Sequence, residues 1–138
     1  MSTAMESAGH QGGKLGLAPG LVVQELGWDS DVDDGVRVMI EDAVDSELIE
    51  EAMEAVDLVL LWWRDDDGDL VDALVDALIS LGDGGVVWLL TPKAGRPGHV
   101  EPGEIGDAAP TAGLHQTSSV SAAHDWSGTR LVTRKSGR

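Results

Sequence analysis

Residues 57–70 read DLVLLWWRDDDGDL, and residues 82–91 read GDGGVVWLLT. Each stretch holds an apolar run, Leu58–Trp63 in the first and Val86–Leu90 in the second, with the length and composition of a strand buried on both faces. Between them, apolar residues recur every three to four positions over 70–81, which predicts an amphipathic helix ended by Gly82. Strand, helix and strand in this order predict a βαβ unit with two parallel strands.

The residues before this unit predict a further strand and helix. Leu21–Leu26 is a short apolar run after a Pro-Gly turn and predicts a first strand. Helical spacing over 32–44 predicts a helix, with Ser30 or Asp31 as its N-cap. A short second strand is expected at 47–49.

The residues after the unit predict a helix and a closing hairpin. Pro102 is placed for the first turn of a helix that ends by Pro110 or Gly113. Two polar-apolar segments, 116–122 and 129–133, predict antiparallel strands joined by a turn at 125–128.

Together these elements predict an α/β fold: a three-layer, Rossmann-like domain with a mixed sheet, mostly parallel, that ends in a C-terminal antiparallel hairpin. We expect a single domain over 15–134, a disordered N-terminal tail at 1–14 and a frayed C-terminus at 135–138.

The composition and the strongly acidic charge limit the kinds of partner that the protein can bind. The chain has 138 residues, no cysteine and a net charge of −16, and the segment 29–83 alone carries −17. Without cysteine there are no disulfides and no thiolate chemistry. The acidic field disfavours nucleic acid and anionic membranes and suits a basic protein surface, or it serves solubility alone. No signal peptide or membrane span is recognisable, so we expect a cytoplasmic protein.

Three loops are expected beyond the carboxyl ends of the strands, where open α/β sheets bind ligands. They are 27–34, 64–69 and 91–99. The first lacks the glycine-rich turn of a phosphate or dinucleotide site, since only Gly27 stands where such a glycine would. Carboxylates already occupy the N-termini of both following helices and would repel a phosphate.

The two acidic loops and the third loop differ in chemistry. The acids of 29–35 and 65–70 fail the spacing of a helix-loop-helix calcium site, so no specific metal site is expected. The third loop carries Lys93, Arg96 and His99 and no acid, and it either holds an anion or is a solvated loop beside the acidic segment.

No catalytic constellation emerges. The serines lack a nucleophile elbow, and the four histidines form no metal-ligand motif. Trp126, at the predicted turn, is either exposed or a packing lid. The ligand-binding candidates are therefore the polar and aromatic residues of the three loops and this turn: Trp28, Asp29, Arg64, Asp65, Lys93, Arg96, His99 and Trp126.

Three segments carry a family resemblance: 14–20 (KLGLAPG), 91–93 (TPK) and 126–132 (WSGTRLV). They resemble the bacterial family known as domain of unknown function 3052. The segments 27–31 (GWDSD) and 61–64 (LWWR) are similar to its actinobacterial branch. The resemblance covers Leu15 to Val132 and implies no assigned activity.

A more distant likeness concerns the fold. The stretch 17–27 resembles the first strand of class I methyltransferases, and 81–86 (LGDGGV) resembles the turn before a later strand of that fold. The closing hairpin fits as well. The likeness implies S-adenosylmethionine as the cofactor of such a scaffold. This sequence departs from the methyltransferase pattern at the cofactor motif, where Trp28 and acids replace the glycine loop. No acid at the end of the second strand can be assigned to the ribose of the cofactor.

These observations leave three readings. The first is a non-catalytic binding or regulatory module on a degenerate methyltransferase-like scaffold, without a cofactor, whose partner is a basic protein surface or a small molecule. The alternative is an enzyme of methyltransferase type that binds a small molecule or nucleotide cofactor and uses Lys93, Arg96 and His99 with Asp29 or Asp65. The third is a structural homodimer.

Overall fold

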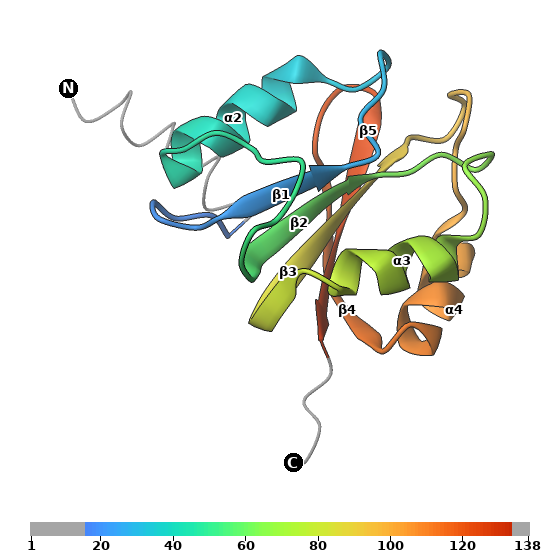
Figure 1. Cartoon of the computed structure of the whole chain (residues 1–138). Helices are drawn as coiled ribbons and strands as arrows, with labels where there is room; N and C mark the ends of the chain where they lie inside the picture. The colour runs from blue at the N-terminus through green and yellow to red at the C-terminus, as the bar shows by residue number, and fades with distance from the viewer. Residues whose placement is uncertain (1–15, 134–138) are drawn as a thin grey trace.

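The computed structural model describes residues 16–133, so the predicted tail at 1–14 and the frayed end at 135–138 lie outside the described residues. Five strands form one sheet in the order β1-β2-β3-β5-β4 (Figure 1). Their bounds are β1 (Val23–Leu26), β2 (Val56–Trp62), β3 (Leu81–Pro92), β4 (Leu114–Ser121) and β5 (Trp126–Thr133).

The mixed sheet and its closing hairpin are confirmed, but the expectation of a mostly parallel sheet is wrong. Pairings β1–β2 and β2–β3 are parallel, whereas β3–β5 and β5–β4 are antiparallel. In the closing hairpin, the last strand, β5, pairs with β3, and β4 lies at the edge of the sheet. Two of the four strand pairings are therefore of each kind, and the antiparallel two comprise more residue pairs.

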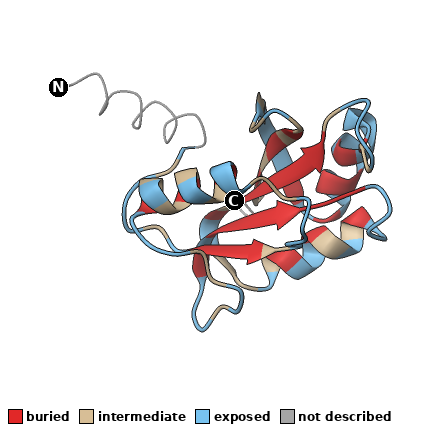
Figure 2. Ribbon diagram, turned by 90° about the horizontal axis from the view of Figure 1, so that it is seen from above, coloured by how far each residue is buried: buried red, intermediate tan, exposed pale blue. Residues whose placement is uncertain are grey.

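Three helices cover both faces of the sheet, as the predicted three layers require. They are α2 (Asp34–Val44), α3 (Leu70–Leu78) and α4 (Pro102–Thr111). In Figure 2 the buried strands lie between helices on either side. The helix α2 packs on one face, and α3 and α4 pack on the other.

The period-two alternation of the strands divides the core between these faces. In β2, Val59 and Leu61 face α3 and α4, whereas Leu60 and Trp62 face α2. Trp88 and Trp126 join the α2 side, so three of the five tryptophans fill one core layer. The chain has no phenylalanine or tyrosine, so these indoles supply the aromatic volume of this core layer.

The predicted strand at 47–49 is reduced to a single bridge, in which Ile49 pairs in parallel with Gln24 of β1. This bridge lies on the side of β1 away from β2. The chain thus leaves β1 toward one side, reaches Ile49, and returns to β2 on the other side. The strand order reverses at β1 and β2, and such a switch point is where open α/β sheets place their ligand crevice.

Two predicted helix ends were misplaced. The helix α2 starts at Asp34 and is capped by Asp33, whose side chain accepts a hydrogen bond from the Val36 amide at 3.1 Å, so Ser30 and Asp31 are not caps. The helix α3 ends at Leu78, and Gly82 is not its C-cap. The glycine-rich segment 82–85 belongs instead to β3, where it bulges between the pairs Val56–Leu81 and Leu58–Val86.

The C-terminal predictions hold in outline. The helix α4 has its proline in the first turn and continues through Pro110 to Thr111, and Gly113 follows with φ 88°. Trp126 is not in a turn, because it starts β5 and is buried. Among residues 16–133, no helix combines the length and apolarity needed to cross a bilayer.

The carboxyl ends of β1 and β2 approach each other most closely at Gly27. A Cβ atom on Gly27 would lie 2.2 Å from the Trp62 carbonyl oxygen, and the residue has φ +78°. No side chain fits this position without separating the two strand ends.

We predict that Gly27→Ala destabilises the fold by roughly 3 kcal/mol, because backbone strain adds to a clash with an immobile carbonyl. Gly84→Ala is the matched control, since Gly84 also has positive φ (+75°) but has no atom within 4 Å of the added Cβ. It should cost only the strain, about 1 kcal/mol. Urea unfolding of both variants checks this, and equal losses would show that the close approach does not matter.

Candidate functional site

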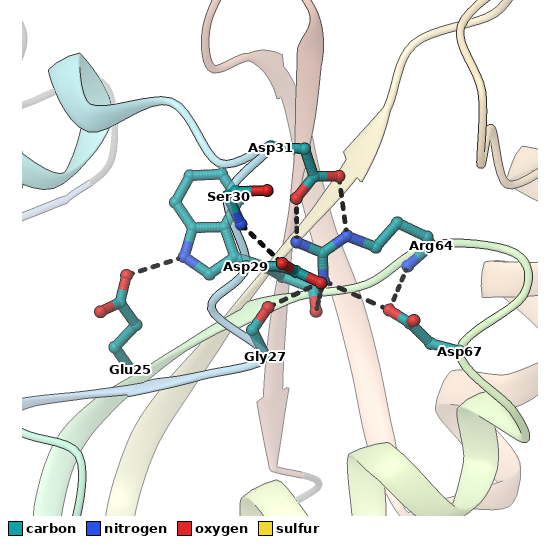
Figure 3. A network of polar contacts seen from close by, with 8 residues as sticks. Glu25, Gly27, Asp29, Ser30, Asp31, Arg64 and Asp67 are labelled. Carbon is teal, nitrogen blue, oxygen red and sulfur yellow. Dashed lines mark hydrogen bonds and ion pairs between the residues drawn. The ribbon is translucent and has the colours of Figure 1, made fainter.

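Arg64 joins the first two predicted loops at the carboxyl edge of the sheet (Figure 3), and the third loop packs against it at Gly98. Arg64 lies two residues beyond the end of β2, and its side chain is only 10% exposed. It extends across the switch point toward the loop after β1. Its guanidinium therefore lies in the crevice that the strand order creates.

Nearly every donor of this guanidinium is used. Nε and one terminal nitrogen, Nη2, contact the two carboxylate oxygens of Asp31 at 3.0 and 2.5 Å, a bidentate pair. The other terminal nitrogen donates to the Gly27 carbonyl at 2.7 Å, and to Asp67 at 3.3 Å. The backbone amide of Arg64 also donates to Asp67, at 3.0 Å. One side chain thus fixes the loops after β1 and β2.

An aromatic layer supports the guanidinium from below. Arg64 lies 5.5 Å from the ring centroid of Trp126, which packs edge-on against Trp62 at 4.8 Å. The indole nitrogen of Trp62 donates to the buried Glu25 at 2.9 Å (Figure 3). Glu25 in turn accepts two hydrogen bonds from Arg37 of α2, at 2.7 and 3.0 Å. The crevice is therefore connected to the core beneath it by charged and aromatic contacts.

The network changes the pKa values of its members. Hydrogen bonding from Arg64 lowers the pKa of Asp31, and partial burial opposes this only in part. Burial acts to lower the pKa of Arg64, but hydrogen bonds to Asp31 and Asp67 outweigh it and the pKa is raised. Arg64 is thus a permanent internal cation.

The third loop packs on the stem of Arg64. The carbonyl of Gly98 accepts from the Asp65 amide at 2.9 Å. A Cβ atom on Gly98 would lie 2.9 Å from the Cβ of Arg64. Contact of this closeness leaves no room for a ligand between the loop and the arginine stem.

The basic residues of this loop are held apart from one another. Arg96 pairs with Asp125 at 3.0 Å, and the Lys93 ammonium contacts the Ser121 hydroxyl at 2.5 Å. The Nδ1 atom of His99 lies 2.9 Å from the Pro92 carbonyl oxygen, and its Nε2 atom lies 3.3 Å from Glu101. The three side chains therefore do not converge on one anion.

A hollow of about 430 Å³ opens beside the crevice, on the side of α3. Trp28, which is 57% exposed, forms one wall with Asp29. Asp67 and Asp76 contribute carboxylates from the opposite side. The hollow therefore combines an accessible indole face with three acidic residues and with Arg64, which pairs with one of them.

The structure thus divides the predicted candidates among several places. Trp28, Asp29 and Arg64 line the hollow, and Trp126 lies beneath Arg64. Arg96 lines a smaller hollow with Trp126, and His99 lines a separate groove. Asp65 is exposed and contributes a backbone contact. Lys93, Arg96, His99, Asp29 and Asp65 therefore form no joint site.

The candidate list missed Asp31 and Asp67, the two carboxylates that hold Arg64. In the sequence they belong to runs of acids and carry no mark that separates them from their neighbours. The one available signal was Arg64 itself, one of two bases among nineteen acids in the segment 29–83. An isolated base directly after a buried strand indicates an internal ion pair.

The histidines and acids of the described residues are not gathered into a metal-binding group. Within 16–133, no three His, Asp or Glu side chains are arranged to hold a metal ion. His124 is exposed and contacts its neighbour Asp125, and His115 lies exposed on the edge strand β4. Neither lies at the switch point, where the fold would place a reacting group.

Comparison with known sequences gives the family. Residues 12–135 match the family described as "Protein of unknown function (DUF3052)", and this chain belongs to it. Uncharacterized proteins of Mycobacterium tuberculosis (strain H37Rv) and Mycobacterium bovis are each 53% identical over 134 residues, which is 96% of this chain and 84% of the relative. The resemblance found in the sequence is confirmed.

Comparison with solved structures gives the fold. A SAM-dependent methyltransferase of Aquifex aeolicus is similar with a TM-score of 0.63 and 12% identity, over 92% of this chain and 89% of the other. A SAM-dependent methyltransferase of Thiobacillus denitrificans, in complex with S-adenosyl-L-homocysteine, is similar with a TM-score of 0.59 and 12% identity, over 94% and 91%. The methyltransferase-like fold is therefore confirmed.

We predict that Arg64→Leu raises the pKa of Asp31, because the hydrogen bond that lowers it is lost. A carboxylate with a lowered folded pKa adds stability above its unfolded pKa of about 3.9 and loses it as pH falls through the folded value. The wild type should therefore lose this contribution in acid, and the variant should lack it. Carboxyl NMR titration and urea unfolding at several pH values measure both effects.

The same variant should lose roughly 2 kcal/mol at neutral pH, because the Gly27 carbonyl and two carboxylates lose a charged donor. Arg130→Leu is the control, since Arg130 is a partly exposed arginine that bonds to Thr117 on the edge strand. Similar losses in the two variants, or an unchanged Asp31 titration, would contradict the role given to Arg64.

Proposed function

We propose that this member of the DUF3052 family is a non-catalytic binding module on a methyltransferase-like scaffold and that it recognises a basic protein segment. One observation carries the proposal: the chain's own guanidinium occupies the crevice at the switch point and is held there by Asp31, Asp67 and the Gly27 carbonyl. A small-molecule cofactor in that crevice would have to displace an internal ion pair.

The chemistry of the remaining hollow favours a cation. Trp28 offers an exposed ring face, and cations bind such faces with roughly 0.5–2 kcal/mol. Asp29 and Asp76 add negative charge around it, whereas the carboxylate of Asp67 is already paired with Arg64, which also lines the hollow. The acidic segment 29–83 extends this field and attracts a basic partner, while it repels phosphates. A lysine or arginine side chain on a partner fits these requirements.

Binding of a basic peptide tests the proposal. We expect an octalysine peptide to bind with an affinity that falls as salt rises, because exposed charges are screened. The binding should change the emission of Trp28, since the other four tryptophans are buried.

Matched variants make this experiment specific. Trp28→Ala should weaken octalysine binding about tenfold, through loss of the cation–π contact. Asp76→Asn should also weaken it, whereas Asp83→Asn, which removes an acid of the same segment outside the hollow, should change it less than twofold. Equal effects of Asp76→Asn and Asp83→Asn would show attraction to net charge without a site.

The second candidate function is an enzyme of methyltransferase type. The fold favours it, as does the place of the hollow beyond the ends of β1 and β2. Two observations count against an enzyme of this type. The glycine-rich turn is missing from the loop after β1, and Arg64 fills the crevice.

We predict that S-adenosylmethionine, S-adenosylhomocysteine and ATP, each at 5 mM, leave the melting temperature unchanged. A ligand at a hundredfold excess over its Kd would stabilise the fold by roughly 2.7 kcal/mol, which a thermal-shift assay detects readily. Saturable stabilisation by S-adenosylmethionine would favour the enzyme and refute the binding module as stated.

A further inference from the structure

A groove of about 310 Å³ lies between the sheet and the first turn of α4, near the end of β3. It is on the face of the sheet that α2 does not cover. Strands β3, β5 and β4 form its floor. The polar part of that floor consists of five hydroxyl residues and one amide: Thr91, Ser119, Ser121, Ser127, Thr129 and Gln116. Val100, Pro102 and Ile105 form an apolar wall above it.

The floor changes character abruptly along the strands. Leu89 and Leu131 face the same side of the sheet and are packed core residues. Two positions further along, on the same face, stand Thr91 in β3 and Thr129 in β5. Valine has the shape of threonine and would continue the core without a polar atom. Packing alone therefore does not account for the hydroxyls.

These two residues are buried, and their hydroxyls have no hydrogen-bond partner among the described residues. Thr91 is 2% exposed and Thr129 is 5% exposed. Within residues 16–133, no group forms a hydrogen bond with either side chain, and no side-chain oxygen is both sealed from solvent and unpaired. Both hydroxyls are therefore open to the groove. Such hydroxyls bond to water or to the polar groups of a ligand that displaces it, so they offer hydrogen-bonding positions on the floor of the groove.

The groove carries little charge for a protein of net charge −16. Its wall contains no Asp, Glu, Lys or Arg. Its one ionisable residue, His99, is held at the rim by the Pro92 carbonyl and Glu101. Hydroxyls and an amide both donate and accept hydrogen bonds, and they suit a ligand that does the same.

We propose that this groove binds a small uncharged molecule that has hydrogen-bonding groups on one side and apolar surface on the other, of the size of a nucleoside or a monosaccharide. The volume is at the lower end of the range for ligand pockets. Thr91 and Thr129 bond to the ligand's polar side, and Val100 and Ile105 cover its apolar side. This site is separate from the hollow at Trp28, and it does not rest on the proposed function.

The experiment uses the full chain with labelled Thr and Ile methyl groups. The probes are adenosine and glucose at 10 mM, each paired with its phosphorylated form, AMP or glucose 6-phosphate. We expect at least one uncharged probe to shift the Thr91, Thr129 and Ile105 methyl signals saturably. Its phosphorylated form should bind at least fivefold more weakly, because no Lys or Arg lines the groove and the neighbouring Lys93 ammonium is already bonded to Ser121.

Two variants test the assigned residues. Thr91→Val and Thr129→Val keep the shape of the side chain and should each weaken binding of that probe roughly fivefold. Thr111→Val is the control, because Thr111 lies on α4 outside the groove, bonded to the Asp107 carbonyl; it should leave binding unchanged. Absence of groove shifts with both uncharged probes, equal binding of the phosphorylated forms, or undiminished binding by both valine variants would overturn the proposal.

A shift confined to the Trp28 indole would likewise count against the groove, and it would leave the proposed function standing. Binding of a probe in the groove, without binding of octalysine, would support the groove site and contradict the proposed function.

Discussion

The contacts of one buried guanidinium organise the functional edge of this protein. Arg64 follows strand β2 and reaches Asp31 and the Gly27 carbonyl across the point where the strand order reverses. Since a guanidinium stays charged and directs its donors in a fixed plane, it can join a carboxylate, a carbonyl and an aromatic face at once. A lysine could not make these contacts together. The loops after β1 and β2 are therefore fixed relative to each other without a bound ligand.

The tryptophan layer makes this arrangement possible. Trp126 lies under the guanidinium, Trp62 lies against Trp126, and the indole nitrogen of Trp62 bonds to Glu25. Glu25 would be a costly buried charge without Arg37 and this indole. Trp126 was expected to be either exposed or a packing lid, and its burial supports the second of these. The acidic composition thus contributes to an ordered interior as well as to the surface.

Much of the fold could be predicted from the sequence, because buried strands and amphipathic helices leave periodic patterns. The predicted segment 86–90 lies within β3, and 58–63 lies within β2 except for Trp63, which follows the strand. The ends of α2 and α3 were not, because acids and glycines are so frequent near both that several residues satisfy the same capping signal. The number of parallel pairings depended on where the hairpin joined the sheet, and local pattern does not specify that.

The site was less predictable than the fold, for a physical reason. A candidate list drawn from charge and position finds residues at the edge of the sheet, and Trp28, Asp29 and Arg64 were found in this way. It cannot tell which of many carboxylates pairs with the single nearby arginine, because that depends on the loop geometry. Lys93, Arg96 and His99 looked like one basic site in the sequence, yet each is bound to a different neighbour.

The Arg64 guanidinium fills the crevice at the switch point and leaves no room there for a cofactor. The most direct measurement is the hydrogen exchange of the Arg64 Nε–H group, followed by NMR with and without 5 mM S-adenosylmethionine. We expect slow exchange that the ligand does not change, because this group donates to Asp31 inside the crevice. Fast exchange in the free protein, or release of the group when S-adenosylmethionine is added, would contradict the account.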